Sequence, residues 1–154
     1  MTVGERLVSY WKGQPIGVRP PVNQKNVKDF EKTFSVRLPE DVLDFYEHAD
    51  GFDQIFDMEN SKYYYDRNGF NFYPLSKVAP VDSIENGAFS FPGSSTYFAF
   101  ADYLDWSWGY ALRLGAGSSR VVIVGERDKQ VHVADTFEEF VGLYIANDDA
   151  IYGG

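Results

Sequence analysis

Few side chains in this 154-residue sequence could do chemistry, because it contains two histidines and no cysteine. The absence of cysteine excludes thiolate zinc sites, iron–sulfur clusters and thiol nucleophiles. His48 lies in an acidic helical segment and His132 alternates with valines, and neither belongs to a metal-binding or catalytic motif. We therefore expect no metal site, no cofactor and no catalytic residue.

Two glycine-containing segments have the wrong spacing for ligand loops. The segment from Asp66 to Gly69 reaches its glycine too early for a calcium loop and has no glutamate at the twelfth position. The segment from Gly115 to Arg120 lacks the third glycine of a dinucleotide loop and precedes an expected strand. Both segments are better explained as turns.

Carboxylates beside aromatic residues are the one arrangement left that could support catalysis. Asp102, Asp105 and Trp106 lie close together in the sequence, and aromatic rings can stack on sugars. A glycan-active enzyme is thus one hypothesis, but it depends on a separation between carboxyl groups that a sequence does not supply. The same residue types favour protein binding, because Trp buries a large area at little rotamer cost and acidic neighbours select a cationic partner. Whether the strand from Trp106 to Tyr110 belongs to the core or to an interface stays open.

Negative charge is concentrated in two parts of a chain whose formal net charge is -9. Residues 1–37 carry seven basic and three acidic side chains, whereas residues 38–61 carry eight carboxylates and no lysine or arginine. Five further carboxylates follow Lys129, again without a basic residue. An acidic balance repels phosphate backbones, so direct binding of nucleic acid is disfavoured. Solvated helix faces explain most such charge runs, and steering of a basic partner is the sharper hypothesis.

The sequence predicts neither export nor membrane insertion. Residues 1–12 contain no apolar stretch of signal-peptide length, and no window approaches 18 consecutive apolar residues. Together with the absence of cysteine, these features favour a cytoplasmic protein with no membrane partner.

Helical periodicity at both ends of the chain and period-two alternation in the middle predict one α+β domain over residues 1–154. Asn68-Gly69 predicts a two-residue hairpin between strands at 63–65 and 70–74, and a polar hairpin is expected around residues 127–129. Alternation along 106–114 places Trp106 and Trp108 on one core-facing side. Helices are expected at 5–11, from Asn23 or Asn26 to Phe34, from Pro39 to a glycine cap at Gly51, and from a capping box at Thr136 to Ile145.

The first third of the sequence contains three short motifs, Phe30-Glu31, Leu38-Pro39 and Ala49-Asp50-Gly51. They resemble the N-terminal signature of the SUKH superfamily, which commonly has Asn-Gly in place of Asp50-Gly51 and includes the yeast Smi/Knr cell-wall-assembly regulators and many bacterial immunity proteins. The likeness continues through residues 98–102, 106–108 and 137–140. It implies an α+β domain with a mainly antiparallel sheet flanked by helices at its N-terminal and C-terminal ends. It also implies no catalytic residues and a function in protein binding, which in bacterial members is often the neutralisation of a toxin, commonly a nuclease.

Charge and resemblance together predict a site that binds a protein partner. We expect an immunity-type inhibitor whose carboxylates engage a basic toxin domain, since a nuclease that grips phosphates must itself be basic. A regulatory or scaffold protein of the Smi/Knr type is the alternative, and a glycan-active enzyme comes third. The expected binding residues are Asp53, Asp57 and Glu59 near the start of the sheet, and Asp102, Asp105 and Trp106 before the tryptophan strand.

Overall fold

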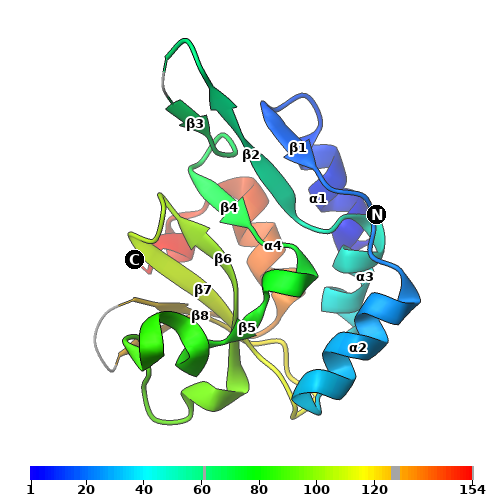
Figure 1. Ribbon diagram of the computed structural model, residues 1–154, viewed down its shortest axis with the longest axis vertical. Coiled ribbons are helices and arrows are strands. Elements are labelled where there is room, and N and C mark those ends of the chain that lie inside the picture. Colours follow the sequence, from blue (N-terminus) through cyan, green and yellow to red (C-terminus); the bar gives the residue numbers. More distant parts are fainter. Residues whose placement is uncertain (61, 126–128, 154) are drawn as a thin grey trace.

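The computed structural model describes residues 1–60, 62–125 and 129–153, with the backbone alone at residues 54–57 and 62–64. The expected α+β fold with a mainly antiparallel sheet is confirmed (Figure 1). The polar hairpin expected around residues 127–129 lies largely outside the described residues.

The larger sheet is antiparallel, with the order β4-β6-β7-β8-β9 and with β5 also paired to β6. Its central strands carry buried side chains on both faces, so both faces of the sheet must be covered. The strands are β4 (Phe70–Phe72), β5 (Ala79–Pro80), β6 (Tyr97–Tyr103), β7 (Trp108–Arg113), β8 (Val121–Val124) and β9 (Gln130–Ala134).

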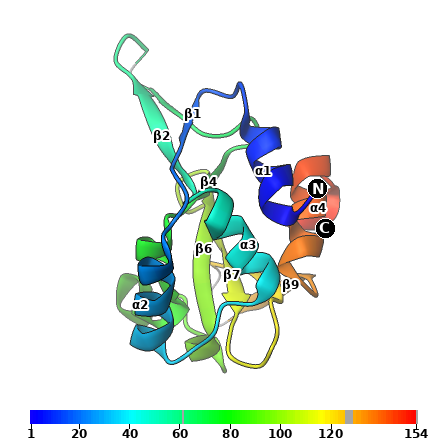
Figure 2. The ribbon, with the colours of Figure 1, turned by 90° about the vertical axis from the view of Figure 1, so that its right-hand side faces the viewer.

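A smaller antiparallel sheet has the order β1-β2-β3 and consists of β1 (Ile16–Val18), β2 (Phe52–Asp57) and β3 (Lys62–Tyr64). The end of β2 and the start of β3 extend away from the helices (Figures 1 and 2). This projection places Asp57 and Glu59 at the periphery of the molecule.

The helices begin where local capping predicts. Asn23 caps α2 by accepting a hydrogen bond of 2.8 Å from the backbone N–H of Asn26. Thr136 caps α4 through the N–H of Glu139, whose carboxylate accepts from the N–H of Asp135. The helices are α1 (Val3–Trp11), α2 (Gln24–Phe34), α3 (Glu40–His48) and α4 (Phe137–Ala146), with the short 3₁₀ helices η1 (Leu75–Lys77), η2 (Val81–Gly87), η3 (Ser94–Thr96) and η4 (Asp149–Tyr152).

Aromatic rings fill the space between the helices and the larger sheet. Phe72 of β4 is central to this core, with ring centroids of Trp11, Phe100 and Tyr144 at 5.2, 5.9 and 4.9 Å. Figure 2 shows α1 and α4 on one side of the sheet and the green segment that contains η2 on the other. That segment covers a second, smaller core, to which Phe89 and Trp106 contribute half-buried rings.

The hairpin predicted at Asn68-Gly69 is wrong. β3 pairs with β2 of the smaller sheet, whereas β4 pairs with β6 of the larger one. The carboxylate of Asp66 accepts hydrogen bonds from the N–H groups of Asn68 (2.9 Å) and Phe70 (2.8 Å), and Gly69 has φ +90°. The aspartate therefore builds a turn that passes the chain from one sheet to the other.

Two further predictions need correction. Gly51 does not end α3, which stops at His48. Instead, a Cβ on Gly51 would lie 2.5 Å from the carbonyl oxygen of Phe72, so glycine allows β4 to approach.

Trp106 does not share a face with Trp108. Its ring packs against Gly109, so closely that a Cβ on Gly109 would lie 2.5 Å from the nearest ring carbon. The chain from Leu104 to Trp106 has positive φ angles, which ends the simple alternation.

Candidate protein-binding site

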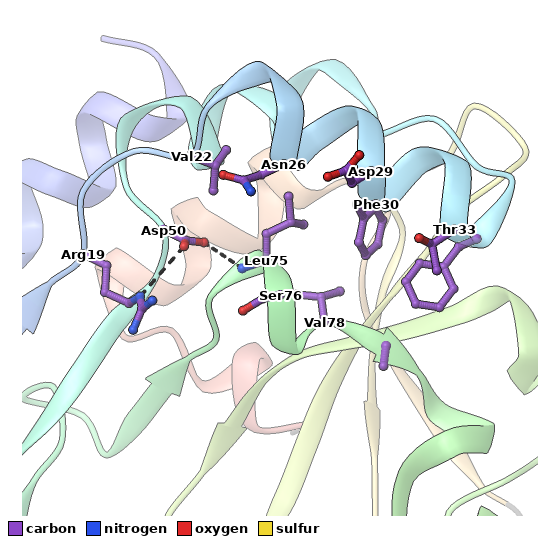
Figure 3. Close-up of a pocket in the computed structure, with 12 residues that line it drawn as sticks. Arg19, Val22, Asn26, Asp29, Phe30, Thr33, Asp50, Leu75, Ser76 and Val78 are labelled. Carbon is purple, nitrogen blue, oxygen red and sulfur yellow. Dashed lines mark hydrogen bonds and ion pairs between the residues drawn. The ribbon is translucent and has the colours of Figure 1, made fainter.

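The residues of the N-terminal signature hold the chain together. The carboxylate of Asp50 accepts a hydrogen bond of 2.7 Å from the N–H of Leu75 and lies 3.8 Å from Nε of Arg19 (Figure 3). The carboxylate of Glu31 likewise accepts from the N–H of Leu38 at 2.7 Å. These motifs therefore position α2, α3 and η1 relative to one another.

A cavity of about 550 Å³ lies between α2 and η1 beside this arrangement (Figure 3). Its charged groups already have partners within the chain. Arg19 pairs with Asp53 at 3.1 Å, and Asp29 pairs with Lys25 at 2.9 Å. The cavity thus offers little uncompensated charge to a ligand. Asp53, one of the expected binding residues, is exposed but is held by this ion pair.

The other two acidic residues expected near the start of the sheet lie at the projecting end of the smaller sheet. Asp57 is the last residue of β2, and its side chain lies outside the described residues. Glu59 is exposed in the turn that follows, next to Met58, whose side chain is 81% exposed. Within the described residues, this end of the smaller sheet therefore places the acidic Glu59 beside an exposed apolar side chain.

The turn between β6 and β7 has an unusual backbone. Leu104, Asp105 and Trp106 follow one another with φ angles of +48°, +51° and +66°. Each such residue costs about 1–2 kcal/mol, because its Cβ approaches the following carbonyl oxygen. Hydrogen bonds from Leu104 N–H to the oxygen of Gly69 and from Ser107 N–H to that of Tyr103, both 2.9 Å, fix the turn. Strain of this kind persists where the surroundings over-determine it, often at functional sites.

This turn presents a mixed apolar and acidic surface. Leu104 is 46% exposed, and Asp105 is also exposed. The hydroxyl of Tyr65, just beyond β3, donates a hydrogen bond to the Asp105 carboxylate. Burial, this hydrogen bond and the charge of Asp105 raise the pKa of Tyr65 to about 12. The structure thus joins the base of the β2–β3 hairpin to the β6–β7 turn, through a tyrosine that the sequence pattern did not single out.

Asp102 lies behind the turn and not on its surface. It is 3% exposed, and one carboxylate oxygen accepts a hydrogen bond of 2.6 Å from the hydroxyl of Tyr73. Its other oxygen, Oδ1, has no hydrogen-bond partner among the described residues. Burial raises the pKa of Asp102, although Tyr73 and the backbone of Trp106 oppose the shift. Asp102 therefore supports the turn from below.

Trp106 is half-buried, and its ring stacks on Phe89 with centroids 5.2 Å apart and an interplanar angle of 12°. Its indole covers the small core on the far side of the sheet. The half-buried aromatic residues that do flank the exposed turn are Tyr103 and Trp108, stacked at 4.6 Å. Alternation alone did not reveal this difference, because it assumes an extended backbone at Trp106.

The histidines make local contacts. Nδ1 of His48 lies 2.7 Å from the carbonyl oxygen of Asp44, and Nδ1 of His132 accepts from Nε of Arg120 at 2.9 Å. Among the residues that the structure describes, no three side chains of the metal-ligating types cluster closely enough to hold an ion. Within the same residues, no helix has the length and apolar character needed to span a bilayer.

Comparison with curated proteins finds no match for this chain. The sequence does match the SMI1 / KNR4 family (SUKH-1) over residues 21–142. The matched span begins before α2, includes the three signature motifs and the strained β6–β7 turn, and ends within α4. The arrangement of elements and the match over most of the sequence agree, and the chain therefore belongs to the SMI1 / KNR4 family (SUKH-1).

Proposed function

We propose that this protein is a non-catalytic binding domain of the immunity type, which neutralises a basic toxin, such as a nuclease, by docking onto it in the cytoplasm. Membership of a family whose proteins often bind other proteins supports this proposal. The observation that carries it is the hydrogen bond from Tyr65 to Asp105, which joins the acidic smaller sheet to the strained β6–β7 turn.

The binding edge that we propose consists of Met58, Glu59, Leu104 and Asp105. It offers carboxylates beside exposed apolar side chains, a combination suited to a cationic protein surface. Carboxylates of the exposed edge accelerate the capture of a basic partner, and the apolar side chains slow its release. Because the turn is already fixed by backbone hydrogen bonds, little ordering entropy is lost on docking.

The positions of the remaining expected residues fit supporting roles. Asp102 holds Tyr73 beneath the turn, and Trp106 fixes the turn against Phe89. A glycosidase would need two carboxylates flanking an accessible sugar site. With Asp102 buried and bonded to Tyr73, the pair Asp102 and Asp105 fits that chemistry poorly.

Co-expression of this protein with the protein encoded by the neighbouring gene tests this function. We expect the intact protein to relieve the toxicity of that neighbour and to co-purify with it. The double variant Glu59→Lys/Asp105→Lys should lose both properties, whereas Glu47→Lys, an exposed charge reversal on α3, should keep them. Equal protection by both variants would show that the proposed edge does not bind the toxin.

The same experiment separates the alternative, a regulatory or scaffold protein of the Smi/Knr type. If no toxin is encoded nearby, and the protein instead co-purifies with a non-toxic host protein, the scaffold role replaces the inhibitor. Thermal melting of each variant shows whether a lost interaction reflects unfolding.

A further inference from the structure

A cleft of about 300 Å³ opens beside the proposed binding edge, between η4 and strands β7 to β9. We call it the aromatic cleft, and define it by Trp108, Ile123, Val131 and Tyr152, which line it. Trp108 follows the strained turn after a single intervening residue, so the cleft and the binding edge are continuous.

The aromatic cleft exists because the helical layer ends before the sheet does. α4 stops at Ala146, and the chain turns at Asn147 into the short η4. Trp108 and Ile123 are only half-buried there, and Val131 is 44% exposed. A Cβ on Gly153 would come within 3.4–3.5 Å of Ile123 and Val131, so the glycine leaves these side chains accessible.

The rings of the cleft are held in place before any ligand arrives. Trp108 Nε1 donates to the hydroxyl of Tyr110 at 3.1 Å, and that hydroxyl donates to the carbonyl of Ile151 at 2.7 Å. Tyr103 stacks on Trp108 and makes an edge contact with Tyr152 at 5.5 Å. Rigid aromatic side chains with satisfied polar groups are typical of residues that dominate binding energy.

Two carboxylates influence Tyr152, one of the residues that line the cleft. Burial raises the pKa of Tyr152, and the negative charges of Asp66 and Asp149 raise it further. Asp149 is exposed at the start of η4, and Asp105 is exposed on the adjoining turn. Among the described residues that line the cleft, Lys129 is the only charged one, and it is exposed. The negative charges of Asp66 and Asp149 favour a cation over the Tyr152 ring.

We infer that the aromatic cleft receives one arginine side chain of the basic partner, an inference that rests on the proposed function. The aliphatic stem of the arginine packs against Ile123 and Val131, and its guanidinium lies over the rings near Asp149. Arginine suits this environment better than lysine, because a guanidinium is planar, weakly hydrated and stacks on aromatic faces.

A titration with small probes tests the inference without the toxin. The indole N–H signal of Trp108, identified with the variant Trp108→Phe, is followed by NMR as N-acetyl-arginine methylamide is added. The citrulline analogue has nearly the same shape without the charge, and the norleucine analogue offers only an apolar stem. We expect the arginine probe to bind at least about threefold more tightly than either analogue.

Variants locate the binding. Asp149→Asn should weaken the arginine probe by about twofold, and Trp108→Ala should abolish its effect on the neighbouring signals of Ile123 and Val131. Glu47→Gln, remote on α3, should change nothing. Thermal melting identifies any variant that is unfolded, and Trp108→Phe then keeps an aromatic ring in the cleft.

Three results would overturn the inference. Equal binding of arginine and norleucine would make the cleft a purely apolar site, and no binding would leave it without a ligand of this class. A dilution-dependent change in diffusion, with the cleft signals affected, would assign it to a second copy of this chain. None of these results depends on the charge reversals at Glu59 and Asp105, so a failure of this inference and a failure of the proposed function can be told apart.

Discussion

The hydroxyl of Tyr65 donates a hydrogen bond to the carboxylate of Asp105, and this contact joins two parts of the chain forty residues apart. Tyr65 follows β3 of the smaller sheet, whereas Asp105 lies in the strained turn of the larger sheet. The bond ties the base of the β2–β3 hairpin to the turn. In the function that we propose, a partner docks across both segments.

Removing the charge of Asp105 should lower the pKa of Tyr65. The pKa of about 12 depends partly on the hydrogen bond to Asp105 and on its negative charge, both of which oppose loss of the phenolic proton. We predict that Asp105→Asn shifts it toward the ordinary value of about 10. A pH titration of ¹³C-labelled tyrosine ring signals measures the shift. Asp149→Asn is the control, and an unchanged Tyr65 in Asp105→Asn would show that the two residues are not bonded.

A buried network should make Tyr144 important for stability. Trp11 Nε1 donates to the hydroxyl of Tyr144 at 2.8 Å, and that hydroxyl donates to the carboxylate of Asp66. Tyr144→Phe removes the hydrogen-bond partner of the buried Trp11 Nε1 and of Asp66 Oδ2, so we expect the free energy of unfolding to fall by about 2 kcal/mol. Urea denaturation measures the change. Tyr152→Phe, which loses an exposed bond to Asn147, should cost less than about 0.5 kcal/mol.

Asp102 should make stability depend on pH in a defined direction. Its pKa is raised in the folded state by burial, so the folded protein retains this proton to a higher pH than the unfolded chain does. The resulting stabilisation is complete below the unfolded pKa of about 3.9 and is lost as pH rises through the folded value. The variant Asp102→Asn has no carboxyl group to titrate at this position. The free energy of unfolding of the wild type minus that of the variant should therefore fall as pH rises from about 3.9 through the folded pKa.

Urea denaturation at a series of pH values from acid to neutral gives this difference. Glu47→Gln serves as a reference for changes unrelated to a buried carboxyl. A wild-type-minus-Asp102→Asn difference that stays constant with pH would contradict the assignment of a raised pKa to Asp102.

Gly51 and Gly13 form a matched pair for testing close approach. Both have positive φ, +68° and +82°, but a Cβ meets the backbone of β4 only at Gly51, and nothing within 4 Å at Gly13. We predict that Gly51→Ala lowers the free energy of unfolding by about 3 kcal/mol and Gly13→Ala by about 1 kcal/mol. Equal costs measured in urea would mean that backbone conformation alone explains the glycine at position 51.

Local signals in the sequence predicted the helices well. Asn23 and Thr136 cap their helices through backbone groups three residues away, so the information lies within one turn. The hairpin at Asn68-Gly69 failed because strand pairing depends on distant partners. Asp66 satisfies the turn locally, which leaves β3 free to pair with β2 and β4 with β6.

The site was only partly predictable for a similar reason. Exposed acids such as Glu59 and Asp105 follow from composition, because charged side chains rarely lie inside without a partner. Asp102 breaks that rule through its bond to Tyr73, which directly follows β4, 29 residues earlier in the chain. Tyr65 and Tyr152 reach the site from the ends of β3 and η4, and no spacing pattern along the chain predicts that they lie there.

The most decisive measurement is the association rate constant of this protein with the basic toxin that we propose as its partner, followed by stopped flow at increasing salt. Docking through an acidic edge predicts that kon falls by about tenfold or more between low salt and about 0.5 M salt. Glu59→Lys/Asp105→Lys should flatten this dependence, and Glu47→Lys should largely preserve it. A kon that is indifferent to salt and equal in all three proteins would contradict the account.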